Sequence, residues 1–215
     1  MATAMTFTSL KEDVQAYLER GTVTDPLVFE RLPTLINNAE RRIARELKVI
    51  GFIIPVTTTL AAGVPVLQKP DRWRDTVSMN FGNGTSNNTR NPVYARSYEY
   101  CRRFWPDQTQ TGAPRFYADY DYNHWLIAPT PDQDYPVEIL YYQIPPLLDD
   151  ANQTNWLTEY ASTLLLYATL LEATPFIKAD ERIPVWQSFY EQGRESLNSE
   201  DMQRIADRSA TRSEA

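Results

Sequence analysis

The residues of this chain that could carry chemistry are few, and they are poorly grouped. His124 is the only histidine and Cys101 the only cysteine in 215 residues. A Ser-His-Asp triad or a histidine-rich metal site therefore has one candidate, and one chain can form neither an internal disulfide nor a cysteine-based zinc site. His124 is followed by Trp125 in an aromatic stretch, where we expect it to be structural.

Two pairs of aspartates have the D-x-D spacing that could hold Mg²⁺ or Ca²⁺, namely Asp119 with Asp121 and Asp132 with Asp134. Each pair lies at a predicted turn, where aspartate is common because its side chain hydrogen-bonds to the local backbone. No phosphate-binding, dinucleotide-binding or serine-hydrolase glycine motif occurs. We therefore expect no catalytic residue, no metal and no cofactor, so the chain is predicted not to be an enzyme. A metal-dependent hydrolase built on Asp119, Asp121 or Asp132 is an alternative function.

Aromatic residues cluster in the middle of the chain, which allows three interpretations. The cluster could form the core of a small sheet, a subunit interface rich in Tyr and Trp, or a platform on which carbohydrate or single-stranded nucleic acid stacks. Its members are Phe116, Tyr117, Tyr120, Tyr122, Trp125, Tyr135, Tyr141 and Tyr142.

The elements that would position these residues predict an α+β fold. Helical periodicity predicts helices from Ser9 to Gly21, from Pro33 to Lys48 after a short turn at Pro26, from Leu157 to Ala173, and from Asp180 onward. Between them lie β-branched runs, a short helix near Ser97 to Trp105, and strands that end at Gln143. We expect an antiparallel helical bundle of residues 1–50 and 151–207, an inserted antiparallel β domain of residues 51–150, and a flexible tail of residues 208–215.

The helix predicted from Leu157 to Ala173 is apolar nearly all round, so most of its circumference must be covered in a bundle or against another subunit. The residues that we expect in the core of the bundle are Leu35, Ile43, Leu47, Trp156, Leu164, Ala168, Leu171, Trp186 and Phe189.

Charge and hydropathy exclude other classes of protein. The formal net charge is −7 and the sequence pI about 4.8, the opposite of a protein that grips nucleic acid by its phosphates. An acidic body would suit a surface that DNA slides past. No stretch has the length of apolar sequence that spans a bilayer, and the N-terminus lacks a signal-peptide pattern. We expect a soluble protein made in a reducing cytoplasm, with no membrane partner.

Several residue strings, in order and along most of the chain, resemble the adaptor (head-to-tail connector) proteins of short-tailed and related tailed bacteriophages. Residues between Val49 and Gln110 share little with that pattern. The strings are Leu32–Ile36, Ala39–Leu47, Gly112–Tyr117, Leu126–Asp132, Tyr135–Tyr142, Pro145–Leu147, Thr154–Leu157, Leu165–Ala173 and Asp180–Ile183.

The resemblance implies a structural virion protein at the head–tail junction, assembled in the cytoplasm of the host bacterium. Such adaptors form a homo-oligomeric ring, commonly a dodecamer, beneath the portal protein. The ring extends the DNA channel, lets genomic DNA pass without specific binding, and docks a tail tube or nozzle protein. C-terminal segments of the family often reach the portal, so Arg204, Arg208 and Arg212 are candidate portal contacts, or parts of a solvated end. The alternative function is a carbohydrate- or receptor-binding module of a phage tail that uses the strands Phe116 to Tyr120 and His124 to Ile127.

Overall fold

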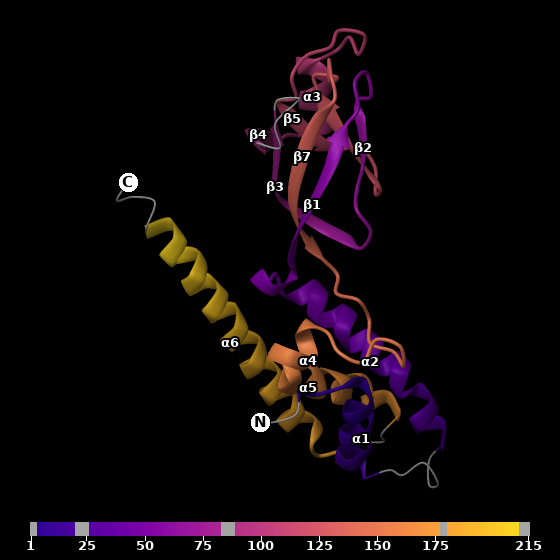
Figure 1. Ribbon diagram of the computed structural model, residues 1–215. Helices are drawn as coiled ribbons and strands as arrows, with labels where there is room; N and C mark the ends of the chain where they lie inside the picture. Colours follow the sequence, from indigo (N-terminus) through magenta and orange to yellow (C-terminus); the bar gives the residue numbers. More distant parts are fainter. Residues whose placement is uncertain (1–3, 20–25, 83–88, 177–179, 211–215) are drawn as a thin grey trace. The chain divides into compact units, whose positions relative to one another are not determined.

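The computed structural model describes residues 4–19, 26–82, 89–176 and 180–210, with the side chains of residues 26, 89–90 and 202–210 outside the description (Figure 1). The chain divides into two compact units. The first contains residues Met1–Phe52 and Ile144–Ala215 and is helical; the second, Ile53–Gln143, is built on a β-sheet. The β unit ends at Gln143 rather than at 150, because the segment after the last strand packs on the helical unit.

The helical unit contains α1 (Phe7–Leu18), α2 (Pro26–Glu46), α4 (Trp156–Tyr160), α5 (Ser162–Glu172) and α6 (Ile183–Ala210). Two short 3-10 helices, η1 (Ile50–Phe52) and η2 (Thr174–Phe176), follow α2 and α5. α1 begins two residues before the predicted Ser9, because Thr6 caps it: the Thr6 hydroxyl accepts a hydrogen bond from the Ser9 amide, and Ser9 Oγ accepts one from the Thr6 amide.

α2 is one helix, and the predicted break at Pro33 is wrong. Val28 and Leu32 before the proline and Ile36 and Ala39 after it are all buried, so a single apolar stripe runs along the helix. Burial of this stripe offsets the hydrogen bond that the proline nitrogen cannot donate.

The apolar helix predicted from Leu157 to Ala173 is divided into α4 and α5 at Ala161, whose φ of −137° and ψ of 37° lie outside the helical region. α5 packs against α1, α2, α4 and α6 of its own unit. Seven of its eleven residues are buried, namely Leu164, Leu165, Leu166, Ala168, Thr169, Leu170 and Leu171. The apolar circumference of α5 is therefore covered within the chain.

Over the described residues, the β unit holds a seven-stranded sheet in the order β1-β7-β3-β4-β5-β6-β2. Its strands are β1 (Ile53–Leu60), β2 (Val66–Gln68), β3 (Trp73–Gly82), β4 (Thr89–Ala95), β5 (Phe116–Asp119), β6 (His124–Ala128) and β7 (Tyr135–Gln143). β7 lies between β1 and β3 and buries alternate residues, as a strand with one face on a core does.

The sheet is mixed rather than antiparallel, which corrects the predicted fold. β4 and β5 pair in parallel, with Tyr94 opposite Phe116. Parallel neighbours need a crossover connection, and residues 96–115 supply it through helix α3 (Tyr98–Phe104). The sequence predicts this helix, but its role in turning the chain back depends on the pairing of the strands on either side.

Each of the seven strands contributes a side chain to one hydrophobic core, so the sheet must curve around it. The cluster includes Leu60 of β1 and Leu67 of β2, at the two edges of the sheet, together with residues of every strand between. α3 packs on β5 and β6 through a second, smaller cluster in which its Cys101 is buried with Ala118 and Leu126. The core interpretation therefore holds for four members of the aromatic cluster, namely Tyr117, Trp125, Tyr135 and Tyr141.

Candidate functional site

The return of the chain from the last strand to the helices is anchored by a buried carboxylate. Glu40 of α2 has no exposed surface. Its Oε2 accepts a hydrogen bond from the Leu148 amide at 3.0 Å, and its Oε1 accepts one from Asn155 Nδ2. Burial raises the pKa of Glu40 to about 7, against the two hydrogen bonds and Arg41, which lower it.

Asn155 joins this anchor to the start of α4. Its Oδ1 caps the helix by accepting from the Leu157 and Thr158 amides at 3.0 and 3.3 Å, while its Nδ2 also donates to the Pro146 carbonyl at 3.0 Å. A single side chain thus fixes the proline segment, α2 and α4 together. The function of this site is structural.

Trp156 is half-buried rather than fully enclosed. Its ring meets Phe52 edge-on at 5.2 Å and Tyr160 at 5.6 Å between centroids. A Cβ added at Gly51 would collide with the Trp156 indole, so the glycine is what lets the backbone of η1 lie against this ring.

Of the other residues predicted in the core, all but one are buried in the structure. Leu35, Ile43, Leu47, Leu164, Ala168, Leu171 and Trp186 are buried. Phe189 is 44% exposed, which corrects its place in the core. The buried side of α6 runs through Trp186 and Tyr190, and Phe189 lies about 100° round the helix from Tyr190.

Phe189 belongs instead to an exposed aromatic row that crosses three helices. Its ring stacks on Tyr167 of α5 at 5.0 Å, and Tyr167 meets Tyr17 of α1 edge-on at 6.3 Å. Tyr17 is 42% exposed. We call Tyr17, Tyr167 and Phe189 the aromatic row. Tyrosine and phenylalanine on an open helical surface are typical of protein interfaces.

A groove of about 570 Å³ lies along α2 and is lined by Asn38, Arg41, Arg42, Arg45, Glu46 and Glu172; we call it the arginine groove. Arg42 is fixed in it, because it pairs with Glu46 at 3.0 Å and Glu172 at 3.4 Å and lies over the Tyr190 ring. Tyr190 donates to Glu46 at 2.6 Å. Burial alone would raise the pKa of Glu46, but the hydrogen bonds from Tyr190 and Arg42 lower it below its usual range. Arg41 and Arg45 are exposed.

The β unit has its own surface of aromatic and arginine side chains, around α3. Tyr98, Tyr100 and Phe104 are each between 37% and 44% exposed. Arg102 lies over the Tyr98 ring at 5.1 Å, and Arg96 lies 5.6 Å from the centre of the Tyr100 ring. The sequence interpretation missed this surface, although the composition of residues 96–104 could have indicated it.

The two strands named for carbohydrate binding offer few rings to a ligand. Tyr117 and Trp125 are buried in the core of the β unit, while Tyr120 and Tyr122 at the turn are exposed. A sugar cannot stack on rings that are enclosed by the sheet.

The aspartates of the D-x-D pairs have separate partners. Asp119 forms an ion pair with Lys69 at 2.7 Å, and Asp121 lies 2.9 Å from His124 Nδ1. Asp132 accepts from the Tyr135 hydroxyl, and Asp134 accepts from the Ala62 amide. In the described part of the chain no three His, Cys, Asp or Glu residues gather in a way that could hold a metal ion.

Lys69 is the buried member of its pair. Its side chain is 4% exposed, its ammonium group lies 3.9 Å from the centre of the Trp73 ring, and it donates to the Asp121 carbonyl at 3.0 Å. These contacts tie the segment between β2 and β3 to the β5–β6 turn.

The three arginines proposed for portal contact fall at the end of the chain. Arg204 and Arg208 lie within α6, which extends to Ala210, three residues into the predicted tail; Arg212 lies outside the described residues. None of the helices in the described ranges has the length and apolarity needed to cross a membrane.

Comparison with known proteins places the chain in a family. No curated protein matches it significantly. The family model described as SU10 adaptor protein matches residues 5–213. Members are phage adaptors, which implies a non-enzymatic structural protein of the virion that associates with portal and tail components at the head–tail junction. The match covers both units, and the chain therefore belongs to the SU10 adaptor protein family of bacteriophages.

Proposed function

We propose that the chain forms a ring beneath the portal, extends the DNA channel and docks the tail. The helical unit, arranged as an antiparallel bundle of N- and C-terminal segments, makes the body of the ring, and the β unit is an insertion in it. We propose twelve copies, the number that the resemblance implies. The C-terminal end with Arg204, Arg208 and Arg212 contacts the portal.

The observation that carries the ring is the aromatic row. A monomer has no need to expose Tyr17 and Phe189, each more than 40% accessible, on helices whose opposite sides are already packed. A subunit of an oligomeric ring has neighbours on two sides. Burial of exposed aromatic side chains at these interfaces supplies binding energy.

The charge of the chain supports the DNA channel. A net charge of −7 repels DNA phosphates, and a conduit must not trap its cargo.

Negative-stain imaging of the purified protein mixed with portal particles tests the ring. We expect stacked rings at one pole of the portal, whereas chains that stay separate from the portal would overturn the proposal. Deletion of residues 204–215 tests the portal contact. Ring binding to purified portal is expected to weaken, and unchanged binding would exclude this segment as the contact.

A further inference from the structure

We propose that neighbouring copies in the ring join through unlike surfaces: the outward face of α1 in one copy docks into the arginine groove of the next. This inference rests on the proposed ring and names its interface. We call Glu12, Asp13 and Tyr17 the α1 acidic face. Both surfaces belong to the helical unit.

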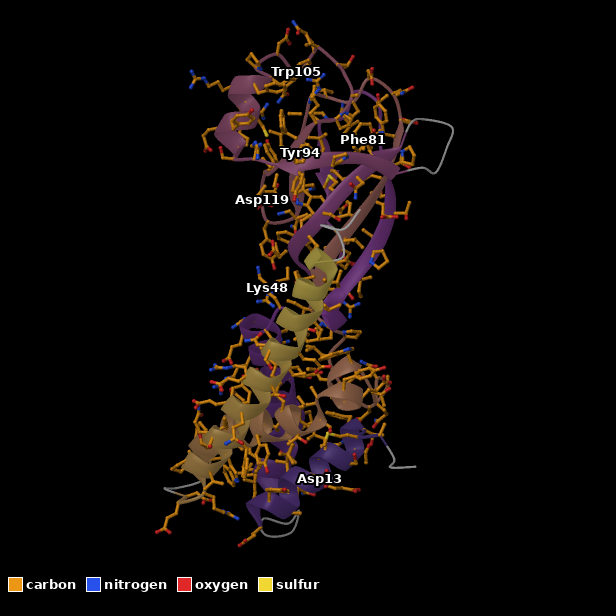
Figure 2. All side chains as sticks on the ribbon, turned by 90° about the vertical axis from the view of Figure 1, so that its left-hand side faces the viewer. Asp13, Lys48, Phe81, Tyr94, Trp105 and Asp119 are labelled. Carbon is orange, nitrogen blue, oxygen red and sulfur yellow. The ribbon has the colours of Figure 1, made fainter. Side chains whose placement is uncertain are left out.

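The α1 acidic face is turned away from the core. The buried stripe of α1 is Phe7, Leu10, Val14 and Leu18, and Glu12, Asp13 and Tyr17 are exposed on other sides of the helix. Asp13 is labelled in Figure 2. Tyr17 follows it by four residues in α1, so the two side chains lie about one turn apart on the same side of the helix. Within the described ranges neither Glu12 nor Asp13 forms an ion pair, and the exposed, small Ala16 leaves room for another helix to approach.

The arginine groove has the complementary charge. Arg41 and Arg45 are four residues apart on α2, so both guanidinium groups lie on the same side of the helix, next to the groove. Glu46, Glu172 and Tyr190 hold Arg42 in place on that side. A carboxylate entering from outside would meet the guanidinium group of Arg41 at the groove, and guanidinium groups favour paired hydrogen bonds with carboxylates.

The groove favours a protein carboxylate over a nucleic-acid phosphate. Glu46 and Glu172 lie beside the arginines and repel a polyanion, and the chain as a whole is acidic. Most of the net negative charge falls in the sequence of the helical unit. A second copy of the chain is therefore a source of acidic helical surface that is present wherever the ring assembles.

Ring geometry calls for this kind of pairing. A cyclic ring is built by head-to-tail contacts in which each subunit offers two different, complementary patches. The α1 acidic face is continuous with the aromatic row through Tyr17, so docking there also covers exposed rings. Opposite charges at the contact would set which faces meet, and the aromatic rings would supply buried area.

Charge reversal in the full chain tests the docking. One variant carries Glu12→Lys with Asp13→Lys, a second carries Arg41→Glu with Arg45→Glu, and a third carries all four changes. Ring formation on purified portal is measured by mass photometry as a function of concentration. Each two-residue variant is expected to need about tenfold more protein or worse, because like charges then face each other.

Rescue separates this docking from other roles of the same residues. An equimolar mixture of the two-residue variants, and the four-residue variant alone, both restore opposite charges at the contact and are expected to form rings. Glu159→Lys with Glu181→Lys makes the same change in net charge at other exposed sites and is expected to assemble as wild type does. Circular dichroism checks that each variant is folded.

The outcomes are distinct for the two proposals. Unchanged assembly of the two-residue variants, or loss without rescue in either restored combination, overturns the docking while leaving the ring intact. Binding of duplex DNA to the wild-type groove, abolished by Arg41→Glu with Arg45→Glu while rings still form, would assign the groove to nucleic acid instead. A wild-type chain that forms no ring on the portal overturns the proposed function and the docking with it.

Discussion

Replacement of Glu40 by Gln tests how the helical unit holds the segment that returns from the sheet. Glu40 is fully buried and accepts from the Leu148 amide and from Asn155. The glutamine side chain has nearly the same shape, cannot ionise, and offers one acceptor oxygen instead of two. The variant therefore lacks one hydrogen bond at every pH, which destabilises it. At high pH it also avoids the cost of a buried charge, which stabilises it relative to wild type.

The pH-dependent part can be worked out from the pKa. Burial raises the pKa of Glu40 from 4.5 to about 7. Each pKa unit corresponds to about 1.4 kcal/mol, so ionised Glu40 destabilises the folded chain by about 3 kcal/mol relative to the protonated form. Because the folded chain binds this proton more tightly than the unfolded chain, the contribution is present below about pH 4.5 and is lost as the pH rises through 7.

Urea unfolding followed by circular dichroism at 222 nm measures the effect, since Glu40 lies in the helical unit. Measurements at pH 5.5 and 8.5 avoid the sequence pI of 4.8, where solubility is lowest. About 2 kcal/mol of the pH-dependent part falls in this window. Glu40→Gln is expected to gain that much stability relative to wild type between the two pH values, on top of a constant loss of about 1–3 kcal/mol for the missing acceptor.

Glu12→Gln is the matched control, because it removes the same charge at an exposed position of the same unit. The difference between this variant and wild type is expected to change little with pH. If the difference between wild type and Glu40→Gln were equally flat, to within about 0.5 kcal/mol, burial would not control the ionisation of Glu40 and the reasoning would be refuted.

Three further substitutions test other contacts. Gly51→Ala is expected to lower the free energy of unfolding by about 1–3 kcal/mol, because the new methyl group collides with the Trp156 indole; a stability equal to wild type would show that the ring moves aside freely. Asp119→Ala is expected to cost about 1–2 kcal/mol in urea unfolding, more than Lys69→Met, because it leaves the buried ammonium group with only the Asp121 carbonyl and the Trp73 ring; the reverse order would contradict this. Phe189→Ser is expected to lower monomer stability by about 1–2 kcal/mol through the lost stacking on Tyr167, and to weaken ring formation on the portal by the folded chain; unaltered ring formation in mass photometry would count against the aromatic row as an interface.

Local patterns in the sequence predict most of the elements of the fold. Periodicity locates α2, α5 and α6, and β-branched runs locate β1, β3 and β7, because burial of one face leaves a repeat that can be read along the chain. Pro33 wrongly predicts a break in α2, because burial of Leu32 and Ile36 on either side offsets the local cost of the proline. Tertiary packing decides that case.

Pairing between strands that are distant along the chain gives only a weak signal in the sequence. The parallel pairing of β4 with β5 joins residues about twenty positions apart through α3, and nothing in either strand alone specifies its direction. Likewise, Glu40 reads as one of several charges on α2, among Arg41, Arg42 and Glu46. Only the return of Leu148 and Asn155 to this position makes it a buried anchor.

The side chains that could form interfaces are also hard to predict from the sequence, because exposure depends on tertiary packing. Phe189 and Tyr190 are neighbouring aromatic residues on α6, and the sequence alone predicts Phe189 in the core. Tyr190 is buried, where its hydroxyl donates to Glu46, whereas Phe189 is exposed and stacks on Tyr167. The choice between them depends on where α2 and α5 lie, which is a property of the folded unit. The surface that remains exposed is what another copy of the chain can bind, so the residues that would join the ring emerge only once the core of the single subunit is known.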